Sequence, residues 1–227
     1  MAFNALLFDL DGTLIDSAPD LRAAANRVLA GHGRRPISLA EARAFIGDGA
    51  AMLVDRAFRA TGVPAIDLAA ETAAFLATYD GHETDETRPY PGVVETMRKL
   101  RAKGMAMAIC TNKPERPTRN ILKALDLAEF FDAVIGGDTV PGCKKPDPAP
   151  IQAALAALGS IGPACMIGDN ANDLSAARAA GIPCVLVTGG YDKGQWDTLE
   201  PEARITDFFG LPAALESLHA SGSSLEP

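Results

Sequence analysis

The sequence contains few groups of the kind that bind zinc or form disulfides. None of its four cysteines belongs to a CxxC pair, and its three histidines are scattered along the chain. A zinc site and a disulfide framework are therefore both unexpected, which fits a reducing cytosol. These residues are Cys110, Cys143, Cys165, Cys184, His32, His82 and His219.

Positive charge and long apolar runs are also in short supply. The formal net charge is −8 at pH 7, which argues against nucleic acid or an anionic membrane as the main partner. No apolar run approaches the length of a membrane span, and MAFNALLFDLDG at the N-terminus has no basic region before its apolar stretch. We therefore expect a cytoplasmic protein without a nucleic-acid or membrane partner.

The apolar residues that are present predict an α/β fold. Short apolar runs typical of buried strands alternate with stretches of helical spacing, and this alternation indicates a Rossmann-like parallel sheet covered by helices on both faces. The predicted strands are Phe3–Leu10, Gly104–Asn112, Phe130–Asp138, Ala164–Asn170, Pro183–Gly190 and the candidate Ala203–Thr206. The predicted helices are Val93–Lys103, Glu115–Leu127, Pro148–Leu158 and Ala171–Ala180.

One long segment interrupts this alternation. Between Ser17 and Arg88 the chain is rich in alanine with helical spacing, is divided by Gly and Pro, and shows no strand run. This pattern predicts an all-helical bundle inserted between the first strand and the rest of the sheet. We therefore predict two domains, an α/β core of residues 1–16 and 89–227 and a helical insert of residues 17–88.

Polar side chains follow four of the predicted strands. Ligands of parallel sheets bind beyond the carboxyl ends of the strands, so these residues are candidates for a catalytic site. In chain order they are Asp9, Asp11 and Thr13; Thr111, Asn112 and Lys113; Asp138, Lys144 and Lys145; and Asp169, Asn170 and Asp173. We interpret Asp138, like Asp16 and Asp20, as a cap or loop carboxylate.

The spacing of the carboxylates suggests a shared cation. Asp9 and Asp11 at i and i+2 face the same way on an extended backbone, and Asp169 and Asp173 at i and i+4 share one face of a helix. Each pair alone is also typical of a turn or a helix start, but together they favour an all-oxygen site of the kind that suits Mg²⁺. The arrangement predicts phosphoryl chemistry with an aspartate nucleophile.

Four motifs at these strand ends resemble those of the haloacid dehalogenase superfamily. DLDGT at Asp9–Thr13 matches the first motif, and CTN at Cys110–Asn112 matches the second, an apolar strand ending in Thr or Ser. KPDPAP at Lys145–Pro150 matches the third, and IGDNANDL at Ile167–Leu174 matches the fourth, G-D-x-x-x-D. The strand pattern extends the match over nearly the whole chain, and the helical insert looks like the family's mobile cap.

The resemblance implies roles for these residues. Asp9 would take the phosphoryl group, and Asp11 would protonate the leaving oxygen and then deprotonate the attacking water. Mg²⁺ would be held by Asp9, the backbone carbonyl of Asp11 and Asp169, with Asp173 binding it directly, through water, or holding Lys145 instead. Lys145, preferred over its neighbour Lys144 because it directly precedes the proline-rich run, would neutralise charge. The expected phosphate- and substrate-binding residues are Thr13, Thr111, Asn112, Gly47 and Gly49.

Within the superfamily, the chain looks most like the phosphoglycolate phosphatases. The matching segments are DLDGTLIDSAPDL, FIGDGAAMLVDRA, YPGV, TNKP and KPDPAP. The resemblance implies a phosphatase for a small phosphorylated metabolite, with 2-phosphoglycolate expected first. The loop Gly47-Asp48-Gly49 would be the specificity loop of the cap, where glycines let backbone amides approach a small anion.

Other functions stay open at this point. Beta-phosphoglucomutases, which are phosphosugar mutases, share all four motifs, although their usual cap has a basic pair where this insert has arginines and no lysine. An amino-sugar phosphate, a nucleotide or pyrophosphate are alternative substrates, and a non-catalytic phosphate-binding protein would need a damaged motif that we do not find. The sequence does not fix the oligomeric state, and we assign no role to TGGYDKG at Thr188–Gly194.

Overall fold

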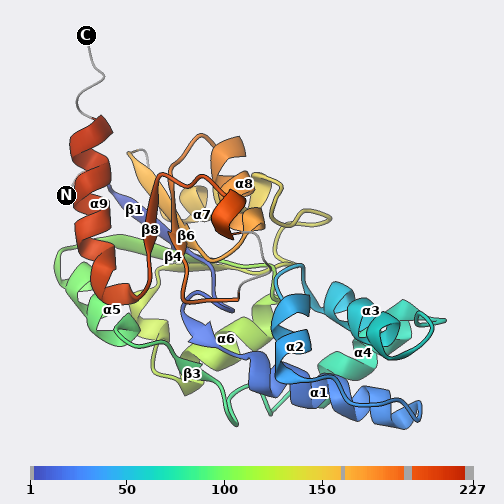
Figure 1. The fold of residues 1–227 in the computed structure, drawn as a ribbon. Helices are drawn as coiled ribbons and strands as arrows, with labels where there is room; N and C mark the ends of the chain where they lie inside the picture. Colours follow the sequence, from blue (N-terminus) through green and yellow to red (C-terminus); the bar gives the residue numbers. More distant parts are fainter. Residues whose placement is uncertain (1–2, 160–161, 192–195, 223–227) are drawn as a thin grey trace.

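A parallel sheet forms the centre of the protein (Figure 1). The computed structural model describes residues 3–159, 162–191 and 196–222. Its six-stranded sheet has the order β5-β4-β1-β6-β7-β8, and all neighbouring strands are parallel. The strands are β1 (Ala5–Phe8), β4 (Ala106–Cys110), β5 (Ala133–Ile135), β6 (Ala164–Gly168), β7 (Cys184–Val187) and β8 (Ala203–Ile205). The predicted α/β fold is confirmed, with each strand inside its predicted run.

Helices bury both faces of this sheet. Leu6 and Phe8 of β1 join an apolar cluster with residues of α5, α6 and α9, whereas Leu7 joins a second cluster with α7 and α8. A strand buried on both faces needs apolar side chains at every position, which explains its uninterrupted apolar run. The helices are α5 (Val93–Ala102), α6 (Glu115–Ala124), α7 (Ala149–Ala157), α8 (Ala171–Ala179) and α9 (Leu211–Gly222), with short 3₁₀ turns η1 (Ala128–Phe130), η2 (Trp196–Thr198) and η3 (Phe208–Gly210).

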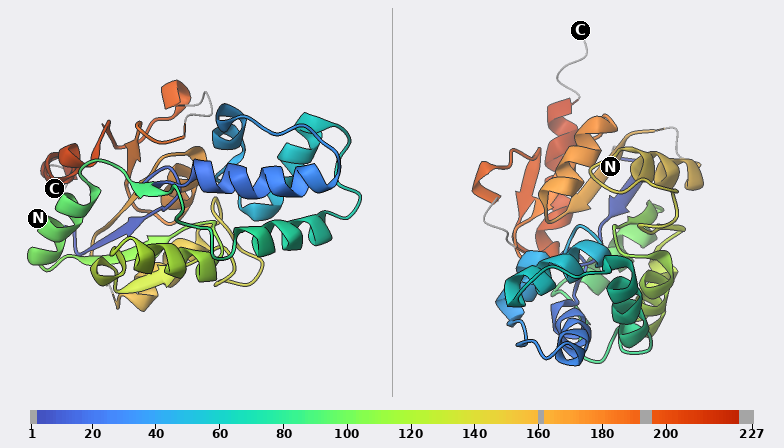
Figure 2. Two further views of the ribbon diagram at one scale, coloured as in Figure 1. Left: turned by 90° about the horizontal axis from the view of Figure 1, so that it is seen from below. Right: turned by 90° about the vertical axis from the view of Figure 1, so that its right-hand side faces the viewer.

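The helices between β2 and β3 lie together at one end of the sheet (Figures 1 and 2). They are α1 (Ala18–Gly31), α2 (Leu39–Phe45), α3 (Ala50–Thr61) and α4 (Leu68–Tyr79). They bury an apolar cluster of their own, which includes Leu21, Leu53 and Phe75. Local signals set their starts: Ser38 and Glu41 form a reciprocal capping box at α2, and Asp67 accepts from the Ala70 amide at α4. The division of the chain into core and cap domains stays a prediction.

Two short strands lie where the chain leaves and re-enters the sheet core. β2 (Ile15–Asp16) pairs antiparallel with β3 (Arg88–Pro89). Beside them, the buried Asp20 carboxylate accepts hydrogen bonds from the amides of Glu86 and Thr87 and from the Thr87 hydroxyl, at 2.7–3.0 Å. The two connections are thus held side by side. The sequence does not predict β2 and β3, because two-residue strands are too short to show a period.

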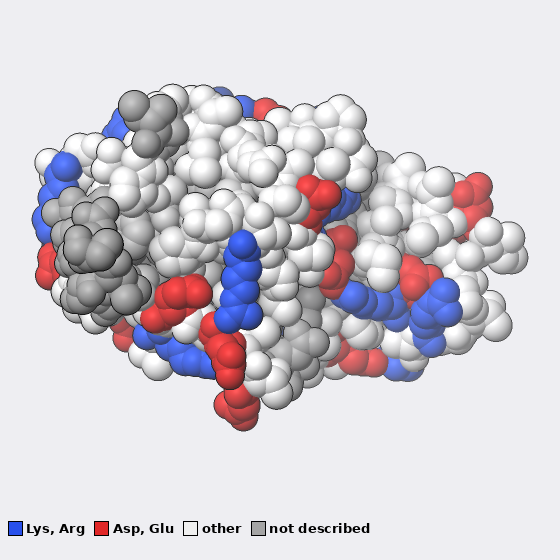
Figure 3. Space-filling view, turned by 90° about the horizontal axis from the view of Figure 1, so that it is seen from above, with Lys and Arg blue, Asp and Glu red and all other residues white. Residues whose placement is uncertain are grey.

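The surface carries charges of both signs. On the face drawn in Figure 3, acidic and basic side chains are interspersed rather than separated into two regions. Within the described ranges, no helix combines the length and apolarity needed to cross a membrane.

Candidate active site

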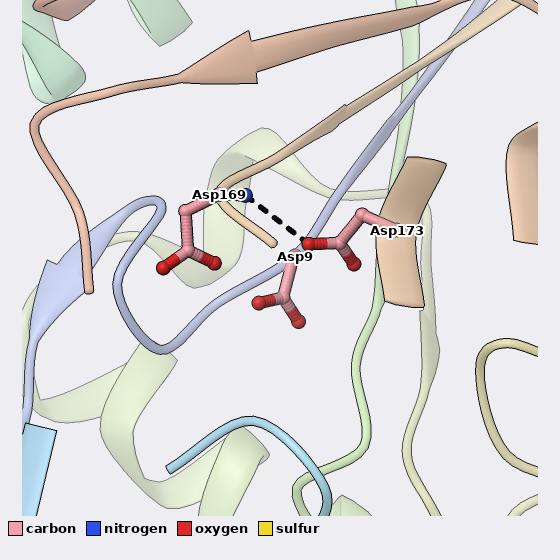
Figure 4. Close-up of side chains that lie close together, drawn as sticks. All are labelled: Asp9, Asp169 and Asp173. Carbon is pink, nitrogen blue, oxygen red and sulfur yellow. Dashed lines mark hydrogen bonds between the residues drawn. The ribbon is translucent and has the colours of Figure 1, made fainter. Parts of the chain in front are cut away.

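Three buried aspartates meet at the carboxyl ends of β1 and β6 (Figure 4). Asp9 follows β1, Asp169 follows β6, and Asp173 lies in the first turn of α8. Each offers one carboxylate oxygen, and these oxygens lie within 4.8 Å of one another. The structure therefore brings together three of the four carboxylates expected around a metal; the Asp11 carboxylate is engaged by Ser17 and Lys113 instead.

The start of α8 explains the spacing of Asp169 and Asp173. Asn170 caps the helix, and Asp173 Oδ2 accepts from the backbone amides of Asp169 and Asn170 at 3.1 and 3.2 Å. Gly168 is needed before them, because a Cβ at that position would lie 2.3 Å from Cγ of Asp173. The motif G-D-x-x-x-D is thus a helix start that turns two carboxylates toward β1.

Burial makes this cluster electrostatically costly. Desolvation, followed by the charges of Asp9 and Asp173, raises the pKa of Asp169 well above its usual value. Desolvation also raises the pKa of Asp173 to about 6, even though Lys145 opposes the shift. A cation among the three carboxylates would relieve this repulsion. Because the donors are carboxylate oxygens, the cluster fits a hard divalent cation such as Mg²⁺.

Lys145 is the cation that the structure places in this cluster. Its Nζ donates to Asp9 Oδ1 at 2.9 Å, to Asp173 Oδ1 at 2.5 Å and to the Cys110 carbonyl at 2.6 Å. Although burial opposes the charged form, Asp173 and Asp9 raise the pKa of Lys145 above its usual value. The neighbouring Lys144 is exposed. The lysine that contacts Asp9 is therefore Lys145, the one preferred because it directly precedes the proline-rich run.

The residues after β4 support Lys145. The Asn112 side chain bonds both the amide and the carbonyl of Lys145, each at 2.9 Å. Its Nδ2 also donates to the Gly47 carbonyl at 3.1 Å. Thr111 is buried beside Asn112, and its hydroxyl accepts from the Lys113 amide. On the other side of the site, the Thr13 hydroxyl lies 3.4 Å from Asp169 Oδ1.

The loop between α2 and α3 lies over the same edge of the sheet. Gly47 and Gly49 adopt positive φ angles of 116° and 89°, a backbone conformation that favours glycine. Asn172 at the start of α8 donates to the Gly47 carbonyl and to Asp48 Oδ1. The observed contacts use the carbonyl of Gly47, and the role of backbone amides in binding substrate stays a prediction.

Comparison with known proteins places the chain in a family. Residues 3–181 match the model of the haloacid dehalogenase-like hydrolases. The chain belongs to this family. It is 41% identical over 219 residues to a phosphoglycolate phosphatase of Caulobacter vibrioides, covering 95% of this chain and 92% of the relative. A crystal structure of a predicted phosphoglycolate phosphatase from Haemophilus somnus superposes with a TM-score of 0.85 and 30% identity, covering 94% of this chain and 98% of the other.

A second relative agrees with these two. The phosphoglycolate phosphatase of Cereibacter sphaeroides strain ATCC 17029 is 44% identical over 217 residues, covering 95% of this chain and 99% of the relative. This haloacid dehalogenase-like hydrolase is therefore a phosphatase and is similar to phosphoglycolate phosphatases.

One lysine beside Asp11 in the phosphatase has no role predicted from the sequence. Lys113 is buried, and its Nζ donates to both Asp11 oxygens at 3.2 and 3.3 Å and to the Tyr79 hydroxyl at 3.0 Å. The signal was present, because Lys113 follows Thr111 and Asn112 at the end of a predicted strand. What the sequence could not show was that α4 brings Tyr79 to the same ammonium.

Tyr191 is a second residue of the phosphatase whose contacts the sequence does not predict. It belongs to TGGYDKG, of which Asp192–Gly194 lie outside the described residues. Its amide donates to Asp169 Oδ2 at 2.9 Å. Its hydroxyl accepts from the amides of Ser17 and Ala18 at 2.7 and 2.9 Å and donates to Asp16 Oδ1 at 2.9 Å. Tyr191 therefore caps the start of α1 and bonds a carboxylate of the acidic cluster.

The Ser17 side chain has another partner. Its Oγ donates to Asp11 Oδ1 at 2.5 Å and makes no capping bond to α1. The phenol of a distant residue thus accepts from the amides of the N-cap and of the first helical residue, whereas an N-cap side chain ordinarily bonds the amide of the second or third. No local signal predicts this contact, since Ser17 and Tyr191 lie 174 positions apart.

Tyr191→Phe is expected to lower the free energy of unfolding by about 1–3 kcal/mol, because the buried Ser17 amide loses its acceptor and the Ala18 amide keeps only its 3.2 Å contact with Asp16 Oδ1. Urea unfolding would measure the change. Tyr90→Phe is the matched control, since Tyr90 is half-buried and its hydroxyl bonds no described residue. Equal stability of the two variants would contradict the capping role of Tyr191.

Proposed function

We propose that this phosphatase hydrolyses 2-phosphoglycolate with the help of Mg²⁺, through a phosphoryl group carried on Asp9. The observation that carries the proposal is the convergence of Asp9, Asp169, Asp173 and the Lys145 ammonium in one buried cluster. The similarity of the whole chain to phosphoglycolate phosphatases supports the substrate.

In the first half of the reaction, Asp9 attacks phosphorus. Lys145 holds Asp9 Oδ1, which orients the carboxylate so that its other oxygen forms the new bond to phosphorus. The ester P–O bond breaks, and Asp11 gives a proton to the oxygen of the leaving glycolate. The backbone amide of Asn112 and the Thr111 hydroxyl bind the oxygens of the transferred phosphoryl group.

In the second half, water releases phosphate. Asp11, now a carboxylate, removes a proton from water as the water attacks the phosphoryl group on Asp9. The bond between phosphorus and Asp9 breaks, and the nucleophile is restored. Lys113 and Ser17 hold both Asp11 oxygens, so the carboxylate keeps one orientation through the two proton transfers.

Mg²⁺ would be held by carboxylate oxygens of Asp9 and Asp169 and by the backbone carbonyl of Asp11. When bound, it supplies positive charge that stabilises the phosphoryl oxygens in the transition state. Asp173 supports the site in another way. Its Oδ1 accepts from Lys145 and its Oδ2 accepts from two backbone amides, so we assign it the role of positioning Lys145 and the start of α8.

The helical insert acts as a cap over this site. A cavity between insert and core is lined by Asp9, Asp11 and Thr111 on one side and by Leu53, Phe75 and Tyr79 on the other. A substrate in this cavity would be shielded from water by the apolar side chains of the insert. In this proposal the cap comprises residues 17–88 and moves about the paired connections β2 and β3 to admit a small metabolite.

A substrate panel tests the proposed function. Phosphate release would be measured from phosphoglycolate, hexose phosphates, an amino-sugar 6-phosphate, nucleotides and pyrophosphate, with Mg²⁺ and with EDTA. We expect a strong preference for phosphoglycolate and a loss on the order of 100-fold or more in EDTA, because the charge of the metal is lost.

The controls separate the alternatives. Excess Mg²⁺ added after EDTA should restore the rate. Rapid release from a hexose phosphate but not from phosphoglycolate would keep the phosphatase chemistry and overturn the substrate. Rearrangement of a phosphosugar with little free phosphate would favour the mutase instead.

A further inference from the structure

The cavity above Asp9 has an uneven distribution of charge. The helical insert contributes mainly apolar groups to its lining, including Leu21, Leu53 and Phe75. Among the described residues that line it, Lys113 is the one basic side chain. A substrate part that lies away from the phosphoryl site therefore meets a single cation in an apolar surrounding.

Lys113 can turn one of its donors from Asp11 to a ligand. Its three N–H donors meet three oxygens, two of them on the single Asp11 carboxylate and the third on Tyr79. Because Asp11 Oδ1 also accepts from Ser17, this oxygen keeps a partner when Lys113 donates to a ligand instead. The Lys113 ammonium forms an ion pair with the Asp11 carboxylate and lines the cavity.

Tyr79 offers a second donor at the same place. Its hydroxyl oxygen accepts from Lys113, and its hydrogen is bonded to no described residue. Burial raises the pKa of Tyr79 to about 12, so the hydroxyl keeps this hydrogen. Phe75 stacks on the Tyr79 ring with centroids 5.9 Å apart, which fixes the direction of the phenol. Lys113 and Tyr79 together present two donors to one anion.

The position of Lys113 and Tyr79 relative to Asp11 determines which part of the substrate contacts them. Asp11, in the proposed reaction, contacts the leaving oxygen, and Lys113 Nζ lies 3.2 Å from Asp11 Oδ2. In phosphoglycolate a single CH₂ separates the leaving oxygen from the carboxylate. A leaving group held at Asp11 therefore brings its carboxylate next to Lys113 and Tyr79.

We propose that Lys113 and Tyr79 form the receptor for the carboxylate of the leaving group and make the phosphatase selective for phosphate esters of small hydroxy acids. The inference rests on the proposed function and adds the residues that determine specificity. The apolar remainder of the cavity strengthens the selection, because the hydroxyls of a sugar would be buried there without partners.

Two substrates that differ only in the carboxylate test this receptor. Ethyl phosphate has a methyl group where phosphoglycolate has the carboxylate. We would measure kcat/KM for both substrates with the natural chain and with Lys113→Met. The preference for phosphoglycolate should fall by roughly 10- to 100-fold, the scale of a lost hydrogen bond to a charged group.

The comparison separates selectivity from an effect through Asp11. If Lys113 acts only by holding Asp11, Lys113→Met would lower kcat/KM for both substrates by the same factor. That result would overturn the proposal. Lys113→Arg keeps the charge and should restore part of the preference. Tyr79→Phe keeps the ring and should lower the preference in the same direction but by a smaller factor; these two variants decide the matter if Lys113→Met does not fold.

Failure of the proposed function has a different signature. If the natural chain does not prefer phosphoglycolate over ethyl phosphate, the substrate itself is wrong and the carboxylate receptor is overturned with it. If the natural chain has that preference and Lys113→Met keeps it in full, only the receptor is overturned.

Discussion

Asp9→Asn is expected to slow phosphate release by roughly 10⁴-fold or more, the scale of loss when a covalent nucleophile is removed. Asparagine has nearly the shape of aspartate but does not form a stable bond to phosphorus. Its side-chain oxygen can still accept from Lys145, which bonds Asp9 Oδ1 at 2.9 Å. The change also removes one charge from a cluster of three buried carboxylates, so the fold should be retained.

Two measurements check this result. Steady-state phosphate release gives the loss of rate, and acid quenching with labelled substrate should trap a phosphoryl group on the natural chain but not on the variant. Asp85→Asn is the matched control, because Asp85 is exposed and pairs only with His82 in the described structure, and its rate should be unchanged. A fully active Asp9→Asn variant would exclude Asp9 as the nucleophile.

Lys145→Met is expected to remove both activity and stability. The ammonium bonds two buried carboxylates, those of Asp9 and Asp173. Without it these charges stay buried and uncompensated, which typically lowers the free energy of unfolding by about 3–5 kcal/mol. Urea unfolding in EDTA would measure the change. Lys99→Met is the control, because its pair with Glu95 is exposed and such pairs contribute at most about 1 kcal/mol.

The loss in Lys145→Met should depend on pH. In the natural chain burial raises the pKa of Asp173 to about 6, against the opposing charge of Lys145. Removing Lys145 raises this pKa further. A carboxyl group with a raised pKa in the folded state favours folding when protonated, and this contribution is lost as the pH rises through that pKa. In EDTA the variant should therefore be more destabilised, relative to the natural chain, at pH 8 than at pH 5. An equal loss at both values would contradict this account.

The residues that could be predicted are those whose partners are set by local geometry. β1 and β6 are buried on both faces, so their apolar runs marked them as central strands, and parallel pairing then brought Asp9 and Asp169 to one edge. The i, i+4 spacing in the first turn of α8 placed Asp173 beside them. These inferences need only the periodicity of strands and helices and the direction of the sheet.

The residues that could not be predicted depend on contacts between distant segments. Tyr191 caps α1 from the loop after β7, and Tyr79 reaches Lys113 from the insert. The sequence favours a cap or loop role for Asp20, but its carboxylate accepts from the amides of Glu86 and Thr87, more than 60 positions away. The sequence does not predict helix α9 either, because its apolar face packs in a cluster with residues of β8 and α5, and this packing cannot be read from the local pattern.

The contacts of Tyr191 join the acidic cluster, the proposed metal site, to the helical insert. Its amide bonds Asp169, and its hydroxyl bonds the first residues of α1. A rotation of the insert away from the sheet would have to break the hydroxyl contacts or displace Asp169, a proposed ligand of the cation. Binding of the cation and closure of the insert are then linked thermodynamically. If the cation increases the affinity for a ligand that closes the insert, that ligand must increase the affinity for the cation by the same factor.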